Sequence, residues 1–146
     1  MATIRLPPDF KEFLKLLNSN EVEYLLIGGY AVGYHGYPRP TGDMDIWIAR
    51  NPVNARRVVN ALEEFGFNCP AELLVKENEV VRMGVPPFQL EILTTISGVD
   101  FSNCYSERLQ VLLDEVEVSL ISLPQLKINK KASGRSKDIT DLENLP

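Results

Sequence analysis

The feature that most constrains the fold is a short apolar segment that ends at two glycines and precedes a second, alternating segment. Residues 24–27 read Tyr-Leu-Leu-Ile, and Gly28 and Gly29 follow directly. A run this short, apolar and bounded by glycine is typical of a buried strand. Residues 43–48 alternate with a period of two, which predicts another strand, and a short helix is expected over residues 30–35. Two strands joined through a helix predict a sheet that carries helices.

Helical periodicity predicts a helix on either side of this pattern. Apolar residues spaced i, i+3, i+4 and i+7 place the first helix over Phe10 to Leu17. Asn51 as the N-cap, Pro52 in the first turn and Gly66 as the stop signal bound the second helix. Both helices are expected to bury one apolar face against the sheet.

The remaining segments complete the expected fold. Four further strands are predicted, at residues 73–75, 80–83, 88–95 and 117–121. A capping box of Ser122 and Gln125 predicts a helix to about Ser133, and Ser136 is expected to cap a final turn or two. Strands interleaved with helices predict the α/β (α+β) class, with helices packed on a small mixed β-sheet.

Length and composition indicate one globular domain. The 146 residues are 45% hydrophobic and 24% charged, and no repeat, low-complexity tract or linker interrupts them. We expect a single domain over residues 1–146, with a core at about 20–100 and a helical tail at about 122–146.

Several classes of protein are excluded by composition. Fifteen Lys and Arg against twenty Asp and Glu give a net charge of −5, which is unlike a strongly basic nucleic-acid binder. Two cysteines, Cys69 and Cys104, lie outside any C-x-x-C pattern, so neither a zinc site nor a disulfide framework is expected. No run approaches the roughly 18 to 20 apolar residues of a membrane helix, and the N-terminal segment lacks the apolar region of a signal peptide. We expect a cytoplasmic protein without a membrane partner.

Three acidic residues are candidates for a metal site. Asp43 and Asp45 stand at i and i+2 on one strand, so they project from the same face with Cα atoms about 6.5 to 7 Å apart and can converge on a hard cation. Glu91 lies on the polar face of a later strand. Each acid taken alone is also consistent with a solvated strand end. Together with a glycine turn, however, three such carboxylates are the set that two Mg²⁺ ions, a triphosphate and a nucleophile require.

The segment from Leu26 to Ile48 resembles the minimal nucleotidyltransferases of the DNA polymerase β superfamily. Their hallmark is a strand, Gly-Gly or Gly-Ser, a short helix and then D-x-D. The segments 51–58 and 123–138 are similar to a bacterial and archaeal group of small nucleotidyltransferase-like proteins related to abortive-infection and toxin–antitoxin proteins. The resemblance covers most of the chain and implies a nucleotidyltransferase-like fold.

The resemblance also implies roles for individual residues. Gly28 and Gly29 would hold the nucleotide phosphates, while Asp43 and Asp45 would bind Mg²⁺ or Mn²⁺. Glu91 would be the third carboxylate, at a position where the superfamily most often has Asp, and the extra methylene can displace a metal ion. Transfer activity therefore depends on where the Glu91 carboxylate lies.

Basic and hydroxyl residues are candidates for contacts with the nucleotide. Arg39 and Thr41 lie on the loop before the acids, where they would contact phosphate or simply face solvent. The tail is locally basic, with Lys127, Lys130, Lys131, Arg135 and Lys137. This run is either the solvated face of a helix, or Lys127 or Lys130 faces the cleft and balances the charge of the triphosphate. The resemblance supports the second interpretation, most strongly for Lys130. Arg135 or Lys137 would bind phosphate or form an ion pair with Asp138.

Two functions from different classes remain open. The first is a metal-dependent transfer of a nucleoside monophosphate from an NTP to the hydroxyl of a small molecule, a partner protein or a tRNA. The chain after Glu91 is too short for a domain that reads nucleic acid, so tRNA is not favoured. The second is a non-catalytic domain that binds nucleotide or a partner, such as the antitoxin of a toxin–antitoxin pair. A Glu91 carboxylate that points away from the aspartates, or that bonds to a structural arginine, would favour the second function.

Overall fold

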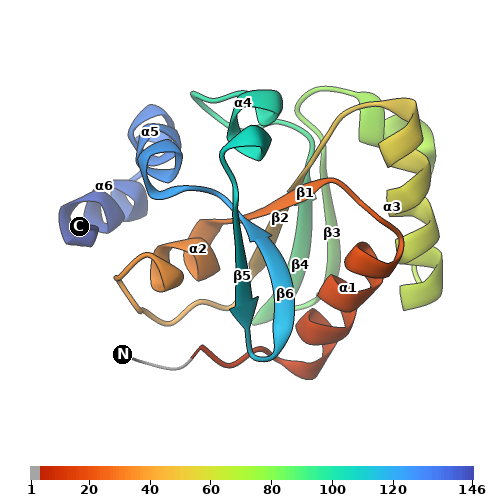
Figure 1. Ribbon diagram of the computed structural model, residues 1–146, viewed down its shortest axis with the longest axis horizontal. Helices are drawn as coiled ribbons and strands as arrows, with labels where there is room; N and C mark the ends of the chain where they lie inside the picture. Colours follow the sequence, from red (N-terminus) through yellow and green to blue (C-terminus); the bar gives the residue numbers. More distant parts are fainter. Residues whose placement is uncertain (1–3) are drawn as a thin grey trace.

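The computed structural model describes residues 4–146, and within them six strands form one mixed sheet (Figure 1). The first three residues, part of the segment in which no signal sequence is expected, lie outside the described residues. The strands are β1 (Tyr24–Ile27), β2 (Met44–Ile48), β3 (Val80–Val85), β4 (Phe88–Leu93), β5 (Leu109–Leu113) and β6 (Val116–Leu120). Their order in the sheet is β3-β4-β2-β1-β6-β5. The pairs β2–β4 and β1–β6 are parallel and the other neighbours are antiparallel, which confirms the predicted α+β class.

Helices cover both faces of this sheet. In Figure 1 the helices α1 (Pro8–Ser19) and α3 (Pro52–Phe65) pack together on one side, and α2 (Gly28–Tyr34), α5 (Leu123–Ser133) and α6 (Ser136–Asn144) lie on the other. The short α4 (Phe101–Ser106) lies near one end of the sheet. In the described part of the chain, no helix is both long and apolar enough to cross a bilayer.

The clearest sequence signals are confirmed. The Asn51 side chain accepts a hydrogen bond from the backbone N–H of Asn54 at 2.8 Å, and Gly66 ends α3 with a positive φ of 97°. The apolar stripe of α1 is fully buried, as its spacing predicts. Met44, Ile46 and Ile48 are likewise fully buried on one face of β2, so the opposite face is left to Asp45 and Trp47.

In the middle of the chain two sequence predictions need correction, and two elements were not predicted. The predicted strand at residues 73–75 is part of a 3-10 helix, η1 (Ala71–Val75), that packs on α3 through the buried Leu74. Only Leu74 is buried there, and three residues are too few to hold a ladder against that local turn. Helix α4 and strand β5 were not predicted, because α4 has six residues and β5 is a mostly exposed edge strand. The strand predicted at 88–95 ends at Leu93.

The tail helices begin differently from the prediction. Ser122 is the N-cap of α5, but its hydroxyl donates to the Gln125 side chain at 3.1 Å and accepts no hydrogen bond from a backbone N–H, so the capping box is not formed. Helix α6 begins at Ser136, and its N-cap is Arg135, whose backbone N–H donates to the carboxylate of Asp138. The cap that Ser136 was expected to provide is therefore replaced by an interaction from inside the helix.

Candidate active site

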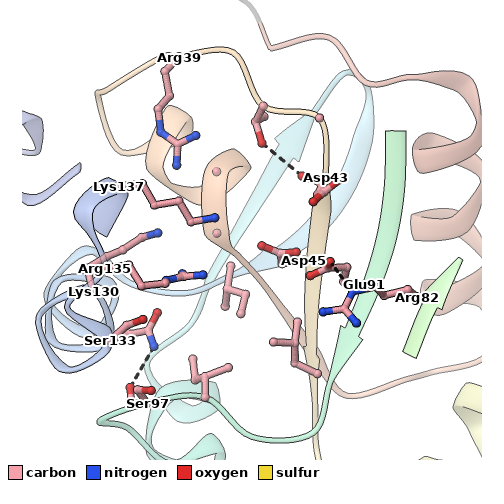
Figure 2. A pocket seen from close by; sticks show the side chains of 18 of the residues that line it. Arg39, Asp43, Asp45, Arg82, Glu91, Ser97, Lys130, Ser133, Arg135 and Lys137 are labelled. Carbon is pink, nitrogen blue, oxygen red and sulfur yellow. Dashed lines mark hydrogen bonds and ion pairs between the residues drawn. The ribbon is translucent and has the colours of Figure 1, made fainter. Parts of the chain in front are cut away.

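Two of the three predicted acidic residues lie side by side at the centre of the sheet. Asp45 on β2 and Glu91 on β4 are register partners in the parallel pair, so their side chains leave the same face. Asp45 is also the register partner of Ile27 on β1, and Gly28 follows Ile27 directly. Asp43 stands just before β2. Figure 2 shows the three carboxylates along one wall of the cavity.

The carboxylate of Asp45 has a raised pKa. Burial raises its pKa, and the charge and hydrogen bond of Glu91 and the charge of Asp43 raise it further, to about 7. Its Oδ1 atom is buried and has no hydrogen-bond partner among residues 4–146. A buried carboxylate oxygen without a donor is costly unless a ligand or cation satisfies it.

Two glycines allow the chain to pass close to this carboxylate. Gly28 has a positive φ of 69°, and a Cβ atom at this position would collide with Oδ2 of Asp45. A Cβ atom at Gly29 would collide with the hydroxyl of Thr41. The glycine pair is thus required by the close approach of the start of α2 to Asp45 and to the loop before β2.

Glu91 has a second partner besides Asp45. Nε of Arg82 donates to Oε1 of Glu91 at 3.1 Å, from the directly opposite position on the edge strand β3. The Arg82 side chain is 61% exposed, whereas that of Glu91 is 18% exposed. The Glu91 carboxylate therefore faces the aspartates and is at the same time paired with an arginine at the surface.

The acidic residues do not form a closed metal-binding shell by themselves. Within residues 4–146, no group of three or more His, Cys, Asp and Glu side chains is placed to hold a metal ion. Asp45 and Glu91 share a hydrogen bond, while Asp43 acts on Asp45 through its charge. Further oxygen ligands would have to come from a bound molecule.

All of the residues assigned to the site from the sequence line one cavity of about 540 Å³. They are Gly28, Gly29, Arg39, Thr41, Asp43, Asp45, Glu91 and Lys130. Arg82, Arg135 and Lys137 also line it, so the cavity contains both the acidic cluster and several cations (Figure 2).

Two aspartates of α6 form ion pairs with most of the basic residues that line the cavity. Arg39 binds Asp141 through two hydrogen bonds, of 2.7 and 2.9 Å. Nζ of Lys130 lies 3.0 Å from Oδ1 of Asp138 and 3.2 Å from Oδ2 of Asp141, and the Lys130 side chain is only 4% exposed. Nε of Arg135 donates to Oδ2 of Asp138 at 2.8 Å. We call these five residues the ion network.

The ion network holds its acids in the charged form. Burial alone would raise the pKa of Asp138, but hydrogen bonds from Arg135 and Lys130 outweigh it and hold this pKa below its usual value. The pKa of Asp141 is likewise lowered, because hydrogen bonds from Arg39 and Lys130 outweigh the effect of its burial. The ammonium of Lys130 is thus already neutralised by protein carboxylates.

Lys137 differs from the other basic residues of the tail. Its side chain is exposed and forms no ion pair within the described residues, and its charge lowers the pKa of Asp45 against the stronger effects that raise it. In Figure 2 its ammonium extends from α6 towards the start of α2. It is therefore better placed than Lys130 to meet an anion in the cavity.

A family model described as "Nucleotidyltransferase of unknown function (DUF6036)" matches residues 5–145. The chain belongs to this nucleotidyltransferase family. No curated protein matches the sequence. Among solved structures, a candidate nucleotidyltransferase from Thermotoga maritima is 14% identical over 96% of this chain and 94% of its own, with a TM-score of 0.62. An antigenic nucleotidyltransferase-like protein from Paracoccidioides brasiliensis is 17% identical over 95% and 75%, with a TM-score of 0.53. At these identities the two structures show a shared fold.

Within this nucleotidyltransferase fold, some residues of the cavity were not predicted. The sequence contained no signal for Arg82, because its pairing with Glu91 depends on the register of β3 against β4. Nor did it indicate the partner of Arg39, since Asp141 is 102 positions away. Arg135 pairs with Asp138, which was one of the two roles considered for it. Trp47 packs against Phe101, and a ring nitrogen of His35 lies 2.7 Å from the carbonyl oxygen of Ile121.

Proposed function

We propose that the protein transfers a nucleoside monophosphate from an NTP to an acceptor hydroxyl with the help of Mg²⁺ or Mn²⁺. The observation that carries this proposal is the acidic cluster: Asp43, Asp45 and Glu91 line one cavity with a glycine turn, and a buried oxygen of Asp45 has no partner among residues 4–146. Membership of a nucleotidyltransferase family supports the reaction type.

The acidic cluster offers a hard divalent cation part of its oxygen ligands and needs a bound triphosphate to supply the rest. Asp43, Asp45 and Glu91 would hold it, and oxygens of the triphosphate would complete the six ligands that Mg²⁺ requires. The unpartnered oxygen and the raised pKa of Asp45 both favour this assignment, because a cation would relieve each of them. When bound, such an ion neutralises charge on the phosphate oxygens.

The residues of the chain would supply positioning and proton transfer. Gly28 and Gly29 let backbone N–H groups approach the phosphates, and Lys137 adds a positive charge beside them. The acceptor oxygen bonds to the α-phosphorus as the bond from that phosphorus to the bridging oxygen breaks, and pyrophosphate leaves. Glu91 takes the proton of the acceptor hydroxyl.

Calorimetry with each NTP, with and without Mg²⁺, tests the site. We expect metal-dependent binding that is lost in the Asp43→Asn and Asp45→Asn double variant and kept in Asp9→Asn, which changes an exposed carboxylate on α1. Absence of nucleotide binding to the wild type would contradict the proposal. A thermal melt of the double variant controls for folding, which we expect to be intact because the substitutions remove repulsion.

A second candidate function is binding without transfer, as in an antitoxin that acts through a partner protein. The pairing of Glu91 with Arg82 favours it, because the arginine already occupies an oxygen of the carboxylate that would have to take the proton. Incubation with α-labelled NTP distinguishes the two. Label on a small molecule, on a neighbouring protein encoded with this one, or on tRNA supports transfer, whereas nucleotide binding that never yields labelled product supports the binding domain.

A further inference from the structure

A second cavity, of about 580 Å³, adjoins the candidate active site. Thr95 and Ile96, which follow β4, line both cavities, so the two spaces share a wall. The second cavity lies on the face of β2 that carries Asp45, because Trp47, two positions further along that strand, is one of its lining residues. The proposed transfer reaction assigns no role to this second cavity.

The second cavity has an aromatic wall. Trp47 meets Phe101 edge to face with ring centroids 5.1 Å apart, and Phe101 stacks on Tyr105 at 5.2 Å. The guanidinium of Arg108 lies 3.9 Å from the centroid of the Tyr105 ring and so occupies a face of that ring. Flat aromatic surfaces of this kind favour a planar ring in the ligand.

Trp47, which lines the second cavity, also carries an unsatisfied polar group. The side chain is 2% exposed, and its indole N–H is buried without a hydrogen-bond partner among residues 4–146. A buried donor without a partner is rare in folded proteins, so Trp47 is a residue whose role the fold alone does not explain.

The position of the second cavity suits the molecule that receives the nucleotidyl group. In the β1–β2 pair, Asp45 is opposite Ile27 and Trp47 is opposite Leu25, so Trp47 and Gly28 lie on opposite sides of Asp45 along the strand. Attack on the α-phosphorus places the attacking and leaving oxygens in line. With pyrophosphate held at the glycine end, the acceptor must approach from the end that carries Trp47.

We infer that the second cavity is the acceptor subsite and that it takes a small molecule with a planar aromatic ring and a hydroxyl group. This inference rests on the proposed transfer function. The ring lies against Phe101, because Phe101 and Arg108 already cover the faces of the Tyr105 ring, and the hydroxyl reaches across the shared wall at Thr95 towards Glu91. Its oxygen then bonds to the α-phosphorus, pyrophosphate leaves and the proton passes to Glu91.

The chain has one tryptophan, so the fluorescence of Trp47 reports on this subsite directly. We would titrate the protein with 4-(hydroxymethyl)benzamide and with cyclohexylmethanol as a control that lacks an aromatic ring, and repeat the benzamide titration with saturating Mg-NTP present. We expect a saturable change with the benzamide and none with cyclohexylmethanol, both in the wild type and in the Asp43→Asn and Asp45→Asn double variant, and no competition from Mg-NTP in the wild type. No saturable change, or displacement of the benzamide by Mg-NTP, overturns the inference; the second result would assign the cavity to the base of the NTP.

A filling substitution provides the matched test. Ser102 lines the second cavity from α4 and does not line the first, so Ser102→Phe should weaken binding of the benzamide by about tenfold or more and leave the Kd of the Mg-NTP complex unchanged. Asn60→Phe, on the exposed face of α3, should change neither constant. Equal affinity of Ser102→Phe and wild type for the benzamide would refute the subsite. Wild-type protein that binds the benzamide but no nucleotide would instead refute the proposed function.

Discussion

Two pairs of acidic residues differ in their surroundings: one pair lines the cavity, and the other is bound to three basic residues that line it. Asp138 and Asp141 in α6 are fully buried, and three cations neutralise them. Asp45 and Glu91 in the sheet face each other, with one exposed arginine as their only ion-pair partner within residues 4–146. The pKa values of Asp138 and Asp141 are lowered, whereas that of Asp45 is raised to about 7.

The comparison separates structural charge from functional charge. A buried carboxylate with its partners in place is part of the architecture, since it gains nothing from a ligand. A buried carboxylate without such partners destabilises the folded protein, and a bound cation can remove that destabilisation. Perturbed groups of this kind are concentrated in functional sites. The ion network therefore fastens α5 and α6 to the loop before β2, and the sheet centre is the place where chemistry is expected.

Breaking the ion network should have the largest effect. Lys130→Met leaves Asp138 and Asp141 buried without their shared partner, so we expect the free energy of unfolding to fall by about 3 to 5 kcal/mol. Urea denaturation measures this loss. The neighbouring Lys131→Met, at an exposed position, should stay within about 0.5 kcal/mol of wild type. Similar losses for the two variants would show that the network is not structural.

Removing the charge of Asp45 should have the opposite sign. Asp45→Asn deletes a charge that burial and Glu91 make unfavourable, so the protein without ligand should gain about 2 kcal/mol of unfolding free energy at neutral pH. The same variant should lose metal-dependent nucleotide binding in calorimetry. A destabilised Asp45→Asn protein would place Asp45 in the same class as the ion network and remove the contrast between the two regions.

The sequence predicts the sheet centre better than the ion network, for a physical reason. The D-x-D spacing and the glycine pair are local patterns, and strand periodicity alone puts Asp43 and Asp45 on one face. Glu91 also follows from alternation along its own strand. These signals need no knowledge of which strands are neighbours.

The ion network could not be predicted in the same way. The partner of Arg39 is 102 positions away, and Lys130 reaches α6 only because Gly134 ends α5 in the left-handed region and turns the chain back. The family resemblance favoured Lys130 as a nucleotide contact, whereas the structure pairs it with two aspartates and leaves Lys137 exposed. Ion-pair partners depend on tertiary packing, which residue spacing within one helix does not encode.

The pH dependence of the free energy of unfolding should report on both the ion network and Asp45. The pKa of Asp138 is lowered on folding, so its contribution is complete above the pKa of the unfolded chain, near 3.8, and is lost as the pH falls below it. The pKa of Asp45 is raised from 3.8 to about 7, so the unfolded chain loses this proton first and stability falls as the pH rises between those values.

Urea denaturation from pH 3 to pH 8 measures the two limbs of this stability profile: the loss at acid pH that belongs to Asp138 and the loss towards neutral pH that belongs to Asp45. We expect wild type to lose about 1 to 2 kcal/mol between pH 5 and pH 7, and Asp45→Asn to lose none over that interval. Both proteins should share the acid limb that belongs to the ion network. An unchanged limb between pH 5 and pH 7 in the variant would mean that another group titrates there.

The smallest effect on stability is expected at Arg82. This residue is the one ion-pair partner of Glu91 among the described residues, so it is where the acidic residues of the sheet centre have a partner like those of the ion network. Arg82→Gln removes an exposed ion pair, so the free energy of unfolding should change by less than about 1 kcal/mol. Arg82 acts through Glu91 as a positioning residue. Once an acceptor is found, we therefore expect kcat to fall about tenfold with an unchanged KM for the NTP, and Arg82→Lys to restore part of the rate. A higher kcat in Arg82→Gln would instead show that the arginine holds Glu91 away from the reaction.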